Sequence, residues 1–111
     1  MTMITDVSDA SFEREVLQSG IPVLVDFWGD HCPACRQISP LLESLAAERV
    51  GELKVVKLHA AENAATSARY GVRAMPTVLI FVGGVVRGQL VGARPKAAFA
   101  ELVDQAGPVP A

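Results

Sequence analysis

The 111-residue chain has only two cysteines, one tryptophan, one tyrosine and no long apolar run. Its net charge is -2, from ten basic and twelve acidic side chains, and no basic patch is interleaved with aromatic residues, which argues against nucleic-acid binding. No apolar run reaches the length of a membrane span, so no membrane insertion is expected. The N-terminus lacks the basic start and long apolar segment of a secretory signal, which predicts a cytoplasmic location, although a processed chain would also lack them.

Half of the residues are apolar, enough to build one compact core. We therefore expect a single domain over residues 1–111, with a frayed tail at 107–111. The small net charge and the hairpin expected near the end of the chain favour a monomer.

Apolar periodicity and turn residues predict the order β-α-β-α-β-α-β-β-α. The run 23–28 predicts a strand in the middle of a parallel sheet covered on both faces. Gly83-Gly84 predicts a two-residue hairpin turn. Strands are expected at 4–7, 23–28, 53–58, 77–82 and 85–91, and helices around 12–17, 32–50, 61–70 and from 95 onward, with a kink at Pro40.

Both cysteines, Cys32 and Cys35, follow the strand 23–28 where a helix is expected to begin. Three residues apart in the first helical turn, they share one face and can form a disulfide. Cys32 lies at the positive end of the helix, which favours its thiolate. A thiolate beside a second thiol is the minimum requirement for thiol–disulfide exchange, and open α/β sheets place their sites at this edge.

Two other interpretations of the cysteine pair remain open. The first is a buried, inert pair. The second is a zinc site, but zinc normally takes four ligands, and only His31 and His59 could join the cysteines, at a spacing that fits no zinc pattern we know. No other functional role is assigned to His59.

Asp26 stands in an otherwise apolar strand. Burying a carboxylate is costly unless it is paired or protonated, so desolvation should raise its pKa and make it a proton shuttle near neutral pH. Lys57, on the next predicted strand, is the expected partner of Asp26. A solvated aspartate at a strand end and a plain surface lysine are the alternatives.

Several separated motifs occur in a fixed order along the chain: 25–28 before the cysteine pair, Pro40 five residues after the second cysteine, 56–58, 70–77, Gly84 and 91–93. Together they resemble the thioredoxin family over roughly residues 7–106. The resemblance implies the thioredoxin fold, an α/β structure with a central mixed five-stranded sheet flanked by four helices. It also implies a protein-disulfide oxidoreductase that reduces substrate disulfides through Cys32 and Cys35.

The resemblance further assigns residue roles. Asp26 should lie beneath Cys35 and accept its proton. Pro76 should follow a cis bond that holds Met75 and Thr77 facing the cysteines and leaves the Met75 backbone free to pair with an extended substrate. An apolar substrate-binding rim is expected from Trp28, Ala34, Met75, Gly92 and Ala93. A core role for Trp28, a trans Pro76 and an ordinary turn at 92–93 are the alternatives.

The chain also departs from the family pattern. His31 stands where the family usually has tryptophan, Pro33-Ala34 replaces Gly-Pro, and Ala60-Ala61 replaces a segment with an acidic residue. A protonated His31 would stabilise the Cys32 thiolate and make the disulfide a stronger oxidant, and the resemblance suggests the same of Pro33. The alternative is a His31 that points into solvent without effect.

No bound cofactor or metal is required, because the cysteines carry the electrons. The resemblance implies that an NADPH-dependent flavoprotein similar to thioredoxin reductase regenerates the dithiol, and that the substrates are disulfide-containing proteins. Two alternatives are a more oxidising member that forms or isomerises disulfides, and a redox-silent binding module with the same fold.

Overall fold

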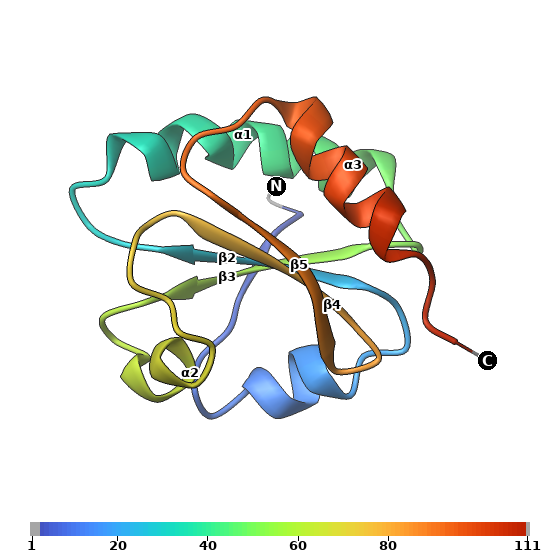
Figure 1. The fold of residues 1–111 in the computed structure, drawn as a ribbon, viewed down its shortest axis with the longest axis horizontal. Helices are drawn as coiled ribbons and strands as arrows, with labels where there is room; N and C mark the ends of the chain where they lie inside the picture. Colours follow the sequence, from blue (N-terminus) through green and yellow to red (C-terminus); the bar gives the residue numbers. More distant parts are fainter. Residues whose placement is uncertain (1–2, 111) are drawn as a thin grey trace.

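A computed structural model describes residues 3–110, which form one five-stranded sheet with helices on both faces (Figure 1). The strand order across the sheet is β1-β3-β2-β4-β5. The elements in chain order are β1 (Thr5–Asp6), the short helix η1 (Glu13–Leu17), β2 (Val23–Trp28), α1 (Pro33–Glu48), β3 (Lys54–His59), α2 (Ala64–Arg69), β4 (Thr77–Val82), β5 (Val85–Val91) and α3 (Lys96–Ala106). The predicted α/β fold and element order are confirmed.

The central strand, β2, has neighbours of opposite direction. It is parallel to β3 and antiparallel to β4. The parallel sheet that the apolar run of β2 suggested is therefore wrong, whereas the mixed sheet that the resemblance implies is confirmed. Burial of β2 on both faces is also confirmed, since five of its six residues are buried. The apolar composition of a strand predicts its burial, whereas the direction of a neighbouring strand depends on the connections between the two strands.

Two apolar clusters lie on opposite faces of the sheet. In Figure 1, α1 and α3 cover one face, and α2 lies on the other side of the sheet with the N-terminal helical segment. Leu24, Val55 and Ile80 point to the cluster under α1 and α3, which includes Ile38, Leu42 and Phe99. The second cluster contains Phe12, Val16, Val25, Phe27, Val56, Leu58 and Phe81.

The first helix is wider than the regular helix that the pattern predicts. Its Gln18 N–H donates to the Glu13 carbonyl at 2.9 Å, a five-residue step typical of π-helical geometry. The helix ends before Gly20, as predicted. Phe12 and Val16 remain buried, so the wider turn preserves the predicted apolar face.

The hairpin between β4 and β5 matches its prediction in both strand limits and turn. Gly83 and Gly84 have φ of 59° and 79°, the left-handed values that a type I′ turn requires. A Cβ on Gly84 would lie 2.9 Å from the Leu17 carbonyl oxygen, so packing also demands glycine there.

The remaining helices differ from the predictions mainly at their ends. α1 contains Pro40 and ends at Glu48, and α2 is shorter than the predicted 61–70. Residues 107–110 form no helix or strand, and Val109 among them packs against the core under α3. No helix in the described part is long and apolar enough to cross a membrane.

Candidate active site

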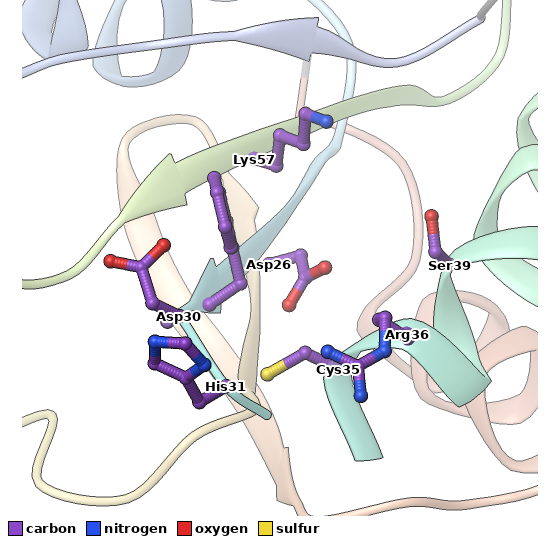
Figure 2. A pocket seen from close by; sticks show the side chains of 9 residues that line it. Asp26, Asp30, His31, Cys35, Arg36, Ser39 and Lys57 are labelled. Atoms are coloured by element: carbon purple, nitrogen blue, oxygen red, sulfur yellow. The ribbon is translucent and has the colours of Figure 1, made fainter. Parts of the chain in front are cut away.

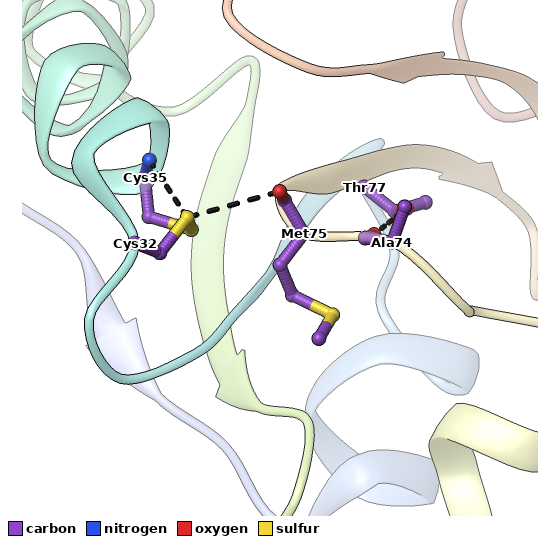
Figure 3. Close-up of a disulfide and its surroundings, with 5 residues drawn as sticks. All are labelled: Cys32, Cys35, Ala74, Met75 and Thr77. Atoms are coloured by element: carbon purple, nitrogen blue, oxygen red, sulfur yellow. Dashed lines mark hydrogen bonds between the residues drawn. A yellow bond between two sulfur atoms is a disulfide. The ribbon is translucent and has the colours of Figure 1, made fainter.

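The cysteine pair lies where the loop after β2 enters α1. Cys32 caps the helix in an extended conformation, and Pro33 is its first residue. A disulfide joins Cys32 and Cys35, whose Cα atoms are 5.3 Å apart (Figure 3). The Cys35 N–H donates to Cys32 Sγ at 3.1 Å. The predicted approach of the two sulfurs across one helical turn is confirmed.

The two cysteines differ in their access to solvent. Cys35 is buried, with 6% of its surface exposed, whereas Cys32 is only half-buried. Cys32 also lies at the helix N-terminus, where the free N–H groups favour negative charge on sulfur. A second molecule therefore reaches Cys32 first.

The loop before β4 lies against the cysteine pair. The Met75–Pro76 bond is cis, as the resemblance implies. Cys32 Sγ lies 3.7 Å from the Met75 carbonyl oxygen, and a dashed line in Figure 3 joins these two atoms. Gly92 N–H donates to the Pro76 carbonyl at 2.9 Å, which brings the exit of β5 to the same loop and leaves Ala93 exposed beside it.

Met75 and Thr77 differ in their exposure to solvent and in their contacts. The Met75 side chain is 39% exposed, and a Cβ on Gly29 would lie 3.7 Å from its Cγ and Cε, so it lies over the loop that leads to the cysteines. Thr77 was expected to face the cysteines, but it is buried and its hydroxyl donates to the Ala74 carbonyl. Thr77 therefore stabilises the loop internally.

A cavity of about 280 Å³ lies beside the cysteine pair (Figure 2). Its lining includes Asp26, Cys35 and Lys57, together with Trp28, Gly29, Asp30, His31, Arg36 and Ser39. The resemblance placed Asp26 near Cys35, and both border this cavity. Asp26 is 5% exposed, and its burial raises its pKa to about 7, against the opposing charge of Lys57. The sequence-based expectation of a raised pKa is confirmed.

Lys57 is the expected electrostatic partner of Asp26, since its charge opposes the rise in the pKa of Asp26, but among the described residues the two form no ion pair. The Lys57 ammonium pairs with Asp6 at 3.9 Å and lies 5.6 Å from the centre of the Trp28 ring. Asp26 Oδ1 is buried without a hydrogen-bond partner in the described part of the chain. Lys57 therefore acts on Asp26 through its field and not through contact.

His59, to which the sequence assigned no role, is tied to the active-site loop. The Glu62 N–H donates to His59 Nδ1 at 3.2 Å, so His59 Nε2 carries the hydrogen and donates to Asp30 at 3.0 Å. The His59 ring also packs edge-on against Trp28, with centroids 4.6 Å apart. Cross-strand register, which pairs Trp28 with His59, is the signal that could have found it.

His31 has an unusual backbone conformation, with φ of 54°. Only a few per cent of residues other than glycine adopt this left-handed region. His31 is exposed, whereas Ala34, in the first turn of α1, is half-buried. His31 borders the cavity beside Cys35. No group of three or more potential metal ligands occurs among the described residues, so the zinc interpretation gains no support.

A cysteine pair at a helix start, with a buried carboxyl behind it, defines the site of a thiol–disulfide oxidoreductase. Comparison with known proteins makes this more specific. A profile of the thioredoxin family matches residues 3–105, and the chain belongs to this family. It is a protein-disulfide oxidoreductase that works by dithiol–disulfide exchange, and the family in general has disulfide-containing substrates and reductase partners.

Three curated relatives show how far the similarity extends. The thioredoxin of Streptomyces clavuligerus is 46% identical over 108 residues, which covers 97% of this chain and 96% of that protein. The thioredoxin of a Synechocystis strain is 43% identical over 105 residues, or 95% of this chain and 98% of the relative. The thioredoxin of Pseudomonas aeruginosa is 45% identical over 101 residues, covering 91% and 94%.

Proposed function

We propose that the chain works mainly as a reductase of protein disulfides, with Cys32 as the nucleophile. The supporting observation is the asymmetry of the pair, in which Cys32 is accessible and Cys35 is buried beside Asp26. The Cys32 thiolate attacks one sulfur of the substrate disulfide and forms a mixed disulfide. The second substrate sulfur leaves as a thiolate and takes up a proton.

In the second step, Cys35 resolves the mixed disulfide. Its thiol gives its proton to the Asp26 carboxylate, and its sulfur attacks Cys32 Sγ. The bond between Cys32 and the substrate breaks, and the substrate sulfur that Cys32 had attacked leaves as a thiolate. The dithiol loses two electrons to the substrate and becomes the Cys32–Cys35 disulfide.

The substrate is expected to bind as an extended segment along the loop before β4. The Met75 backbone provides hydrogen-bonding groups for strand addition. Trp28, Ala34, Gly92 and Ala93 complete the apolar rim together with the Met75 side chain, and their small or flat surfaces allow a backbone to approach. His31, Pro33 and Lys57 act around the sulfurs and the buried acid, and Thr77 acts only through the loop that it stabilises.

The electrons that restore the dithiol come from NADPH through a flavoprotein similar to thioredoxin reductase. No cofactor is bound by the chain itself. We place this electron transport in the cytoplasm, where it contributes to redox homeostasis, and we expect the protein to act as a monomer.

The atypical Cys-Pro-Ala-Cys site motivates a second candidate function, a more oxidising member that forms or isomerises disulfides. A positive charge on His31 at the start of α1 would favour the thiolate and raise the reduction potential. Exchange of His31 for tryptophan should then lower the potential in a glutathione titration. An unchanged potential would remove His31 from the explanation.

The redox potential of the cysteine pair separates the two candidates. A value at or below the cytosolic glutathione poise supports the reductase, and a value well above it supports the oxidant. Two variants test the assigned steps. Cys35→Ser should retain the substrate as a mixed disulfide, whereas Cys32→Ser should form none and lose turnover. Binding of a partner that survives the loss of both cysteines, without any turnover in the native chain, would favour a redox-silent module.

A further inference from the structure

Three charged side chains form one row across three adjacent strands. Asp6 of β1 is in register with Lys57 of β3, and Lys57 is in register with Asp26 of β2. Register partners in parallel strands point to the same face of a sheet. The row Asp6–Lys57–Asp26 therefore lies on the face covered by α1, with the buried acid at its inner end.

The lysine in the middle of this row pairs with the outer acid. Its ammonium is 3.9 Å from Asp6 Oδ1, whereas Asp26 Oδ1 has no hydrogen-bond partner in the described part of the chain. Figure 2 shows Lys57 and Asp26 on neighbouring strands at the edge of the same cavity. One cation thus stands between two carboxylates and contacts only the exposed one.

We propose that Asp6 is a positioning residue for the exchange reaction, because it competes with Asp26 for Lys57 and so limits how strongly Lys57 stabilises the ionised form of Asp26. The functional meaning of this competition rests on the proposed role of Asp26 as the proton acceptor for Cys35. The competition itself rests only on the geometry of the row.

Coulomb attraction gives the direction of the effect. Lys57 lowers the pKa of Asp26, but burial raises it by more. Without Asp6, the flexible Lys57 side chain is free to turn toward the cavity and approach Asp26, which would favour the carboxylate further. Exposed ion pairs contribute little free energy, so the expected fall in the pKa of Asp26 is about half a unit.

Other charged and titratable groups around the cavity also influence the pKa of Asp26, so they must be the same in every variant that is compared. Asp30 and His31 face it from the loop after β2, and Cys35, Arg36 and Ser39 face it from α1. His59 does not line the cavity, but it is hydrogen-bonded to Asp30, which does. None of these residues changes in the variants below, so their contributions to the pKa of Asp26 cancel in the differences.

The test is a carboxyl NMR titration of Asp26 in the reduced full-length protein. Asp6→Asn should lower the pKa of Asp26 by about half a unit, and Lys57→Met should raise it. In the Lys57→Met background, Asp6→Asn should have almost no effect. An Asp6→Asn shift that persists without Lys57 would mean that Asp6 acts directly through its own field, and an absent or upward shift would mean no competition; either result overturns the proposal.

A matched control is Asp104, an exposed acid that pairs with Arg49 at 2.8 Å elsewhere on the surface. Asp104→Asn should leave the pKa of Asp26 unchanged, and an equal shift there would show a general charge effect and overturn the proposal. The pH profile of mixed-disulfide resolution provides the functional readout, and its midpoint should shift with Asp6→Asn in the same direction. If Asp26→Asn leaves this profile unchanged, the proposed role of Asp26 fails, while the NMR titration still decides whether Asp6 competes for Lys57.

Discussion

The neighbouring strands β2 and β3 present different chemistry on their two faces. Toward η1 and α2, cross-strand neighbours are apolar, with Val25 beside Val56 and Phe27 beside Leu58. Toward α1, the pair Leu24 with Val55 is apolar, but the next two pairs are Asp26 with Lys57 and Trp28 with His59. Both faces therefore provide stability from packing, but only the face toward α1 also carries polar groups, and these lie near the cysteine pair.

The physical reason for the difference is the position of α1. Its long apolar face covers the sheet, but its first turn carries Cys35, which borders one cavity together with Asp26. Burial of Asp26 under this turn raises its pKa to about 7, which is useful for proton transfer and unfavourable for folding. The comparison predicts that replacing Phe27 on the apolar face and replacing Asp26 on the polar face will change stability in opposite directions.

The largest loss of stability is expected on the apolar face. Phe27 is fully buried, and Phe27→Ala should lower the free energy of unfolding by about 3–5 kcal/mol through lost contacts and a cavity. Denaturant titration measures this loss. The redox potential of the folded protein should stay unchanged, and a clear shift in potential would show that the two faces are not separate.

On the polar face, replacing Asp26 should change the free energy of unfolding in the opposite direction, toward greater stability. Because the folded-state pKa of Asp26 is raised, the folded protein binds more protons than the unfolded chain between about pH 4 and pH 7, and stability falls as pH rises through this window. Asp26→Asn removes this cost. The variant should be more stable by up to roughly 4 kcal/mol at pH 8.

The gain should disappear below about pH 4, where Asp26 is protonated in both states. Denaturant titrations of both proteins across this pH range measure the difference. A gain that is independent of pH would show that the amide, and not the lost ionisation, accounts for the stabilisation.

A smaller loss of stability is expected when the hydrogen bond between His59 of β3 and Asp30 of the active-site loop is removed. His59→Phe keeps a ring against Trp28 but loses the hydrogen bond to Asp30, and should cost about 1 kcal/mol. A double-mutant cycle with Asp30→Asn isolates the pair. Strictly additive losses of stability would show that His59 and Asp30 are not coupled. The distant ion pair Arg49–Asp104 provides a control cycle, whose variants should not alter exchange rates.

Much of the fold could be predicted because the apolar runs are short and clearly bounded. β2, β4 and β5 have the predicted limits, and Gly83-Gly84 marks the hairpin. Asp26 could be identified because a single acid in a buried strand requires an explanation. The direction of β4 beside β2 could not be predicted, since apolar composition shows that a strand is covered but not which strand lies next to it.

The polar contacts around the site were harder to predict. His59 carried no local signal, and its contacts depend on register with Trp28 and on the position of the Asp30 loop. The preference of Lys57 for Asp6 depends on a third strand that is far away in sequence. These are contacts between side chains on different strands, which periodicity along one strand does not reveal.

The sequence by itself determined the elements, the cysteine pair at a helix start and the presence of an acid in the central strand, because these follow from local pattern and chemistry. Only the tertiary structure decided which groups surround that acid. Strand order places Lys57 between Asp6 and Asp26, and packing of α1 on the sheet excludes water from Asp26. Desolvation and charge–charge distance set the properties of the site, and both exist only once the chain is folded.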